Sequence, residues 1–208
     1  MKIATTLALA LVVAGCSGSS KKPPTTTQDA APPAVSDIIR NVEEAGVSLK
    51  RALGSLQIVV EGSSDIAKGR EAYLADLAKL DADVQVVRDR SADMGRRRDA
   101  YLQEWLNRSA AIKSESVKTA AEKRRTELMT EFMTLTAKSN AVRKSFAPLH
   151  SALQDCGRFL ESDSTPAGAA TLATEYENIK KLETEVHQAA GEYKTQLSKI
   201  ADLLGLSR

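Results

Sequence analysis

The fold of this 208-residue chain is set by the stretch Val35-Ser-Asp-Ile38-Ile-Arg-Asn-Val42-Glu-Glu-Ala45-Gly-Val-Ser-Leu49-Lys-Arg-Ala52-Leu-Gly-Ser-Leu56-Gln-Ile-Val59. The numbered residues are apolar and recur at intervals of three and four. A period of about 3.5 residues sustained in this way is typical of a helix that buries one face against other helices. The pattern predicts a helix over residues 35–61.

Three further runs repeat this spacing, and they predict helices over residues 65–112, 115–161 and 166–204. No strand-like alternation separates them, so the predicted fold class is all-α, an elongated antiparallel and coiled-coil-like helical bundle over residues 35–208. Around Lys113–Ser116 the chain either turns or continues as one helix, and we favour a tight turn because a long helix must double back to bury its apolar face. Pro148 should bend the third helix, because proline lacks the amide hydrogen that the helix needs.

The other informative stretch is the start of the chain. Residues 1–15 have a cationic head at Lys2, an apolar run and small residues, which is the pattern of an export signal. The apolar run is too short for a transmembrane helix, which needs about 20 residues. The end of the stretch, Val13-Ala-Gly-Cys16, resembles the bacterial lipobox, whereas an ordinary secretory signal would use a cut near Ala14 and leave Cys16 without a role.

The lipobox resemblance implies cleavage between Gly15 and Cys16 and covalent attachment of diacylglycerol and an N-acyl chain to Cys16. These chains would hold the protein on a membrane. Ser17, in place of aspartate, implies by the same resemblance the outer membrane, facing the periplasm. Residues 16–34, rich in proline, threonine and serine, have little to bury and are predicted to be a disordered tether.

The overall charge gives no support for a polyanionic partner. The chain has 29 basic and 27 acidic residues, and removal of residues 1–15 takes away Lys2 alone. This near neutrality gives no argument for nucleic acid, which an exported lipoprotein would not meet. No cofactor beyond the acyl chains is expected.

The charges are nevertheless unevenly distributed. Residues 88–125 contain eleven basic and six acidic side chains, net +5, and residues 155–192 contain three basic and eight acidic, net −5. These stretches could pair with each other or face solvent. They could also leave a patch for an anionic envelope polymer or an acidic envelope protein, made by two triplets that an antiparallel hairpin would bring close: Arg96, Arg97, Arg98, Lys123, Arg124 and Arg125.

The sequence offers little for catalysis. It has no glycine-rich phosphate loop, G-x-S-x-G or C-x-x-C motif. His150 and His187 are isolated from other ligand-type residues apart from single i, i+4 neighbours, which does not make a metal site. Cys156 lies on the apolar face of the third helix, where a buried thiol is expected. We therefore expect a protein that is not an enzyme and holds no metal.

The region from about Asp99 to Leu204 resembles an uncharacterised bacterial family, domain of unknown function 2959. The resemblance depends on Tyr101 and Trp105, Ile112 to Ser114, Lys118 to Arg125, Ala147 to Leu149 and Leu153 to Asp155. The chain departs from the family pattern at Phe159-Leu-Glu-Ser-Asp-Ser-Thr-Pro. The resemblance implies an envelope lipoprotein with a helical body, and it brings no activity.

Two functions follow as hypotheses. The first is a non-enzymatic, lipid-anchored envelope protein that acts as a structural or protein-interaction module. The second is a carrier or sensor that binds an apolar or anionic small ligand between its helices, lined by the polar breaks Arg98, Arg108 and Ser139. Assembly into a homo-oligomer is left open.

Overall fold

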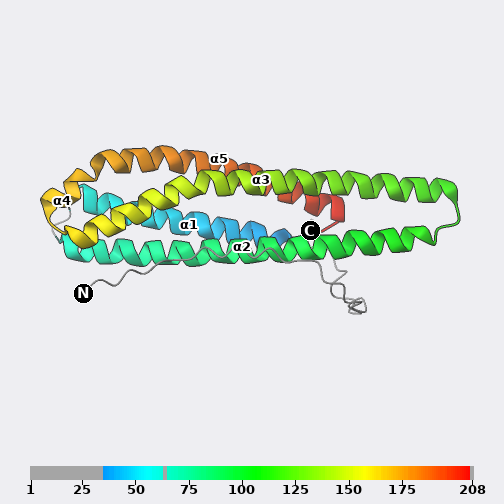
Figure 1. Cartoon of the computed structure of the whole chain (residues 1–208), viewed down its shortest axis with the longest axis horizontal. Helices are drawn as coiled ribbons and strands as arrows, with labels where there is room; N and C mark the ends of the chain where they lie inside the picture. Colours follow the sequence, from blue (N-terminus) through cyan, green and yellow to red (C-terminus); the bar gives the residue numbers. More distant parts are fainter. Residues whose placement is uncertain (1–34, 63–64, 207–208) are drawn as a thin grey trace, which may run out of the picture.

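A computed structural model describes residues 35–62 and 65–206 as five α-helices, with no strand among them. The helices are α1 (Val35–Val60), α2 (Ile66–Ala110), α3 (Glu115–Ser162), α4 (Pro166–Thr171) and α5 (Ala173–Leu204). The four long helices run antiparallel in an elongated bundle, and α4 closes one end of it (Figure 1). The predicted all-α antiparallel bundle is confirmed.

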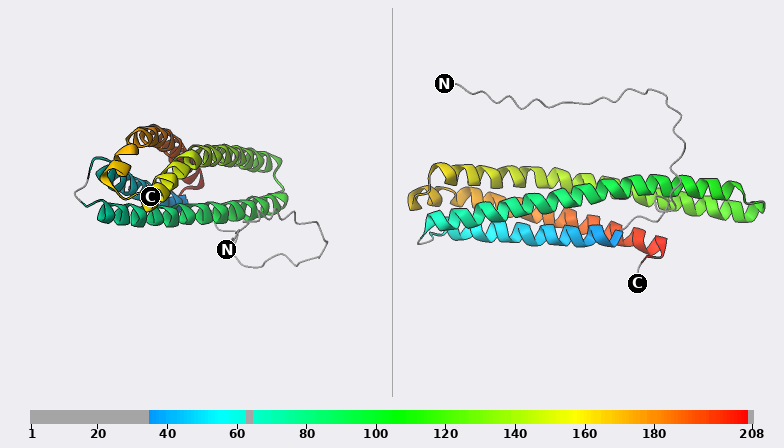
Figure 2. Two further views of the ribbon diagram at one scale, coloured as in Figure 1. Left: turned by 60° about the vertical axis from the view of Figure 1, so that its left-hand side comes forward. Right: turned by 90° about the horizontal axis from the view of Figure 1, so that it is seen from below.

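The long helices are not equal in length, and this divides the molecule. We call the part where all four lie together the four-helix body; it contains α1, α4, α5 and residues 66–105 and 124–162. The remaining residues 106–123 project beyond the ends of α1 and α5, and we call them the projecting hairpin (Figures 1 and 2). α1 begins at the end of the body from which the projecting hairpin emerges.

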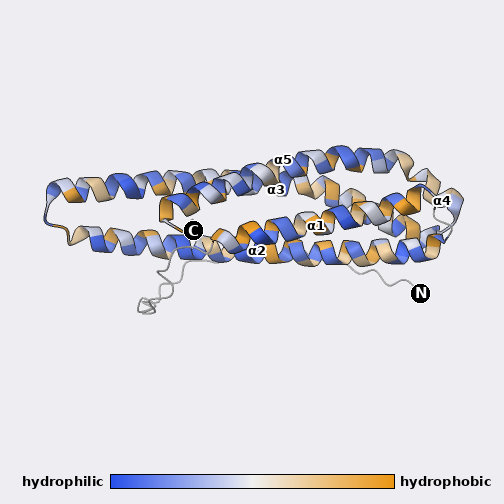
Figure 3. Cartoon of the chain, turned by 180° about the vertical axis from the view of Figure 1, so that it is seen from behind, coloured by the Kyte–Doolittle hydropathy of each residue, from blue (hydrophilic) through white to orange (hydrophobic). Residues whose placement is uncertain are grey.

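The apolar faces read from the sequence form the core of the four-helix body. The fully buried positions include Leu56 on α1, Tyr73 on α2, Leu153 on α3 and Ile179 on α5. In Figure 3 most of the deep orange lies in the body, whereas the projecting hairpin is mostly blue and pale. Each fully buried leucine or isoleucine contributes about 1.5–3 kcal/mol of transfer free energy.

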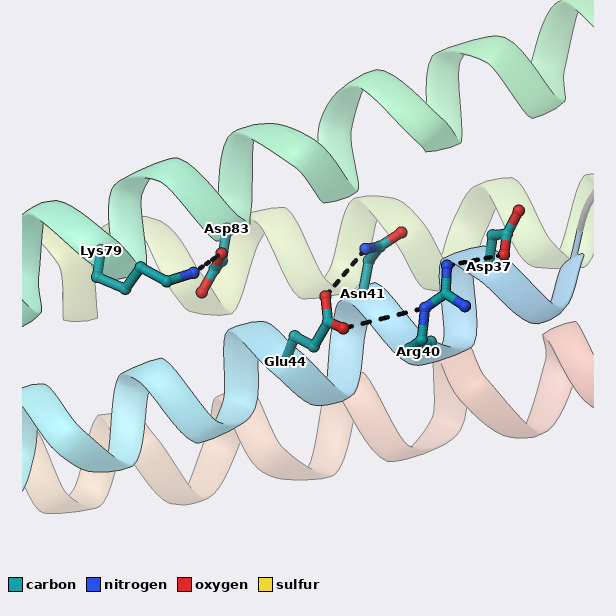
Figure 4. Close-up of polar contacts among 6 residues, drawn as sticks. All are labelled: Asp37, Arg40, Asn41, Glu44, Lys79 and Asp83. Atoms are coloured by element: carbon teal, nitrogen blue, oxygen red, sulfur yellow. Dashed lines mark hydrogen bonds and ion pairs between the residues drawn. The ribbon is translucent and has the colours of Figure 1, made fainter.

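Polar contacts fix the helices to each other. The buried Tyr73 hydroxyl donates a 2.6 Å hydrogen bond to the Leu153 carbonyl and so joins α2 to α3. Burial raises the pKa of this tyrosine far above its usual value, so the hydroxyl keeps its proton. Ser48 on α1 donates a 2.6 Å bond to Asp83 on α2, which also pairs with Lys79 (Figure 4).

On the outer face of α1, contacts stay within the helix. Arg40 bonds to Asp37 at 2.9 Å and lies 3.9 Å from Glu44, and Asn41 donates to Glu44 (Figure 4). Such exposed pairs at i, i+3 and i, i+4 stabilise a helix by only a few tenths of a kcal/mol.

The helix ends follow the sequence signals closely. Gly62 takes a left-handed φ of 95° after α1, and Gly205 takes a φ of 70° after α5. Asp65 caps α2 by accepting a 3.0 Å bond from the Lys68 backbone N–H. The predicted tight turn is confirmed, because α2 ends at Ala110 and α3 begins at Glu115.

One detail differs from the sequence prediction, and a second concerns the bend expected at Pro148. The expected single helix 166–204 is divided at Leu172, a buried residue between α4 and α5. The break has no glycine or proline of its own, and it lets α4 cross the end of the body before α5 runs back along it. α3 passes through Pro148 without interruption, and its yellow C-terminal part runs obliquely to its green N-terminal part (Figure 1).

Candidate functional site

The first half of the predicted basic patch is paired with acidic neighbours on its own helix. Arg96 and Arg97 both bond to Asp93, at 3.0 and 2.8 Å, and Arg98 pairs with Asp99 at 2.7 Å. Burial acts to raise the pKa of Asp93, but hydrogen bonds and charge from the two arginines outweigh it and leave that pKa lowered. These three guanidinium groups therefore have counter-ions within the chain.

The three residues of the second half of the patch have different surroundings. Arg124 donates a 2.7 Å bond to the Leu203 carbonyl at the end of α5. Arg125 is half-buried, and its Nε has no partner in the described residues. Lys123 is exposed and forms no ion pair there. No hydrogen bond or ion pair of the described residues joins the two triplets, so the six residues do not make one free cationic patch.

The two oppositely charged stretches also stay apart. In the described part of the chain no ion pair joins residues 88–125 to residues 155–192. The lysine–glutamate ion pairs between different helices are instead Lys138–Glu192, Lys194–Glu43 and Lys199–Glu131, at 2.6, 3.2 and 2.8 Å. The possibility that the stretches neutralise each other is therefore wrong, and the basic excess stays toward the projecting hairpin.

The projecting hairpin exposes two apolar residues. Val117 is 53% exposed and Leu106 is 44% exposed, because α1 and α5 end before they reach this level. Ile112 is half-buried beside a shallow hollow of about 230 Å³, which is also lined by Arg108. The only buried residue in this segment is Ser109, whose hydroxyl bonds to the Trp105 carbonyl of its own helix.

Two aromatic rings meet at the base of the projecting hairpin. The rings of Tyr101 and Trp105 meet edge to face, with centroids 5.8 Å apart. Both line a hollow of about 70 Å³ together with Arg124 and with Leu204 at the end of α5.

The charges of the projecting hairpin are unbalanced. Residues 106–123 contain four basic side chains (108, 113, 118 and 123) and two acidic ones (115 and 122), which gives a net charge of +2. Arg108 pairs with Glu104 at 2.7 Å. The other three, Lys113, Lys118 and Lys123, have no ion pair within residues 35–62 and 65–206. This combination of exposed apolar residues and free lysines is the candidate interaction surface.

The cysteine and the two histidines considered for catalysis or metal binding lie in surroundings that suit a structural role. Cys156 is buried, and burial, followed by the charges of Glu175 and Asp155, raises its pKa to about 11, so it stays an unreactive thiol. His150 bonds to Asp81 at 2.6 Å, and His187 lies 3.2 Å from Glu183. Among the described residues, no three side chains of the metal-binding types gather into a site.

The lining expected for a carrier is only partly assembled. Arg98 and Ser139 line the same hollow between α2, α3 and α5, whereas Arg108 lines the separate hollow in the projecting hairpin. The three residues therefore do not share one site.

The signal peptide 1–15, the cleavage position at Gly15 and Cys16, and the tether 16–34 all lie outside the described residues. Within the described residues, none of the helices carries an apolar run long enough to span a bilayer. The lipid anchor therefore stays a prediction from the sequence.

Searches against protein-family models, curated proteins and solved structures find no match to this chain. The resemblance to domain of unknown function 2959 accordingly stays an expectation.

Proposed function

We propose that this protein is a non-enzymatic, lipid-anchored module of the bacterial cell envelope, held by acyl chains on Cys16 and facing the periplasm from the outer membrane. Its role is to bind an acidic envelope protein through the projecting hairpin. The observation that carries the proposal is the exposure of Leu106 and Val117 together with three unpaired lysines on a protruding element.

The chemistry of this surface favours a protein over an anionic polysaccharide. Leu106 and Val117 need apolar surface opposite them before their burial can contribute free energy, and a polyanionic sugar chain does not supply it. Lys113, Lys118 and Lys123 favour acidic residues around that apolar contact. An aromatic residue at the base, Trp105, adds the kind of anchor that is enriched at protein interfaces.

The position of Val35 bears on the distance between the proposed anchor and the hairpin. The tether would enter the body at Val35, at the end from which the projecting hairpin emerges. A chain fixed at Cys16 would thus keep the hairpin at a limited distance from the membrane, because residues 16–34 span at most roughly 65 Å when fully extended.

The interaction is tested by photo-crosslinking in intact cells, with a crosslinking amino acid placed at Leu106 or Val117. Ile58, which is 60% exposed on the four-helix body, is the matched control. We expect both hairpin positions, and not Ile58, to capture the same protein.

Capture of this protein must depend on the positive charge of the hairpin. Lys118→Glu with Lys123→Glu should abolish the crosslink, whereas Lys50→Glu with Arg51→Glu on the exposed face of α1 should preserve it. Equal capture from Ile58, survival of the crosslink after reversal of the hairpin lysines, or capture of only a second copy of this chain would contradict the proposal.

The anchor is tested separately. Cys16→Ser should move the protein from the membrane fraction to the soluble fraction or leave it uncleaved, as judged by fractionation and by mass spectrometry of the N-terminal peptide. If the N-terminus of the wild-type protein carries no acyl chains, the proposed lipid anchor is wrong. The proposed interaction of the hairpin is not affected by this result.

A further inference from the structure

The buried core of the four-helix body is interrupted near its middle. Along α2 the buried positions pass from Leu80 directly to Met94, and along α3 they pass from Leu135 directly to Leu149. One core cluster lies toward α4 and the other toward the projecting hairpin. In each of these two helices the interval covers about four helical turns, which is too long to be a chance irregularity of the 3.5-residue pattern.

A hollow of about 120 Å³ occupies this interval, and all four long helices line it. Its apolar lining includes Val42 on α1, Val84 on α2, Val142 and Phe146 on α3, and Val186 on α5. Engineered apolar cavities of about 150 Å³ take up small apolar molecules. The hollow therefore has both the size and the lining to hold a short hydrocarbon chain.

One glycine that lines the hollow has free space beside it. Gly46 lines the hollow, and a Cβ atom built on it would meet no atom within 4 Å. A larger side chain at this position would thus enter empty space, and it would not clash with a neighbouring helix.

One end of the hollow is polar. The hydroxyl of Tyr193, a residue only 3% exposed, lies 3.2 Å from the Ser91 hydroxyl. Ser139 from α3 joins them in the lining, so three helices supply hydroxyl groups. A second hollow of about 200 Å³ shares these three residues and Arg143, so both spaces border the hydroxyl cluster.

The charges around the hollow have one sign. Arg88 and Arg143 line it from α2 and α3, and both are exposed, so they stand where the hollow meets solvent. Neither forms an ion pair in the described part of the chain. No aspartate or glutamate of the described residues lines either hollow, and Arg98, which lines the second, is already paired with Asp99.

We propose that this mid-body hollow binds a small amphipathic carboxylate, a medium-chain fatty acid. Its hydrocarbon chain lies among the valines, and its carboxylate faces Arg88 and Arg143 with the Ser91 and Ser139 hydroxyls beside it. Guanidinium groups suit this role because their paired N–H donors match a carboxylate. The site is independent of the projecting hairpin and of the lipid anchor.

Octanoate, octanol and octylammonium provide the test, with the full chain carrying Cys16→Ser so that no acyl chain of its own competes. Isothermal titration calorimetry should show one octanoate per chain, and octanoate should raise the melting temperature. Octanol should bind at least about tenfold more weakly because it lacks the charge, and octylammonium should not bind. Equal affinities for all three compounds, or no saturable octanoate binding at millimolar concentration, would overturn the proposal.

Two variants locate the site. Gly46→Leu should fill the hollow and abolish octanoate binding, whereas Gly54→Leu, two turns further along the same helix and also facing open space, should bind as the parent does. Arg88→Gln with Arg143→Gln should weaken octanoate about tenfold or more and leave octanol unchanged, a result that does not depend on the folding of the Gly46 variant. Unchanged octanoate affinity in the arginine double variant would show that the anion lies elsewhere.

Discussion

The four-helix body and the projecting hairpin share helices α2 and α3 and the same heptad-like pattern, yet only the body has an apolar core. In the body, Leu128, Phe132 and Leu135 of α3 are buried because α5 and the start of α1 cover them. Eleven residues before Leu128, on the same helix, Val117 is 53% exposed. Two antiparallel helices alone can cover only one narrow seam, and the difference shows that burial here depends on the third and fourth helices.

The comparison predicts a large difference in local stability, which is the largest effect expected. Backbone amides of the projecting hairpin should exchange with opening free energies near zero, whereas those around Leu153 should approach the global value, higher by at least about 4 kcal/mol. Native-state hydrogen exchange followed by mass spectrometry measures both segments in one sample. Equal protection in residues 116–121 and 149–156 would show that the hairpin and the body unfold as one unit.

Truncation of a single leucine should show the same contrast. Leu153→Ala removes a fully buried side chain and should lower the free energy of unfolding by about 2–5 kcal/mol. Leu106→Ala, at a position 44% exposed, should change it by less than about 0.5 kcal/mol. Urea denaturation followed by circular dichroism gives both values, and a large loss for Leu106→Ala would mean that the hairpin is covered in solution.

Removal of one hydroxyl should give a smaller difference. Tyr73→Phe deletes the 2.6 Å hydrogen bond to the Leu153 carbonyl and should cost about 1 kcal/mol. Tyr101→Phe at the base of the hairpin is the matched control, because its hydroxyl makes no hydrogen bond among the described residues. The same denaturation assay should find the control within about 0.5 kcal/mol of the parent, and equal losses in both variants would rule out the Tyr73 bond as the cause.

The smallest expected effect is a pH dependence at the α3–α5 contact of the body. Hydrogen bonds from Lys199 and then Gln196 lower the pKa of Glu131 below its ordinary value of 4.5. Because the folded-state pKa is the lower one, the stabilisation is fully present above pH 4.5 and is lost as the pH falls through the folded-state value. Glu131→Gln should therefore have a lower free energy of unfolding than the parent at neutral pH. This difference between the two proteins should become smaller as the pH falls.

Urea midpoints measured across this pH range test the prediction. Glu127, one turn earlier on α3, has no ion pair in the described residues. The difference in stability between Glu127→Gln and the parent should therefore not change in this way with pH. A constant gap for Glu131→Gln at all pH values would mean that the contact does not depend on the carboxylate charge.

The parts of the fold that depend on local pattern were predictable from the sequence. The 3.5-residue period located the long helices, and Asp65, Thr165 with Pro166, and Gly205 are residue types that favour the helix ends at which they stand. The pairing of Arg96 and Arg97 with Asp93 was also readable, since the residues are three and four apart on one helix. The break at Leu172 was not, because no residue there opposes a helix.

The candidate sites depended on contacts between distant parts of the chain. Arg124 was a candidate member of a basic patch, but it donates to the Leu203 carbonyl, 79 residues away. Arg88 and Arg143 lie off the apolar seams and are unremarkable in the sequence, and only the fold brings them to one hollow.

The sequence by itself determined that this chain forms long amphipathic helices, because helix formation and its punctuation depend on neighbours within about four residues. The tertiary structure decided where those helices end relative to one another, and hence which apolar residues are covered. That choice depends on the summed burial of four helices, so neither the exposed tip at Leu106 and Val117 nor the hollow beside Gly46 could be located from spacing alone.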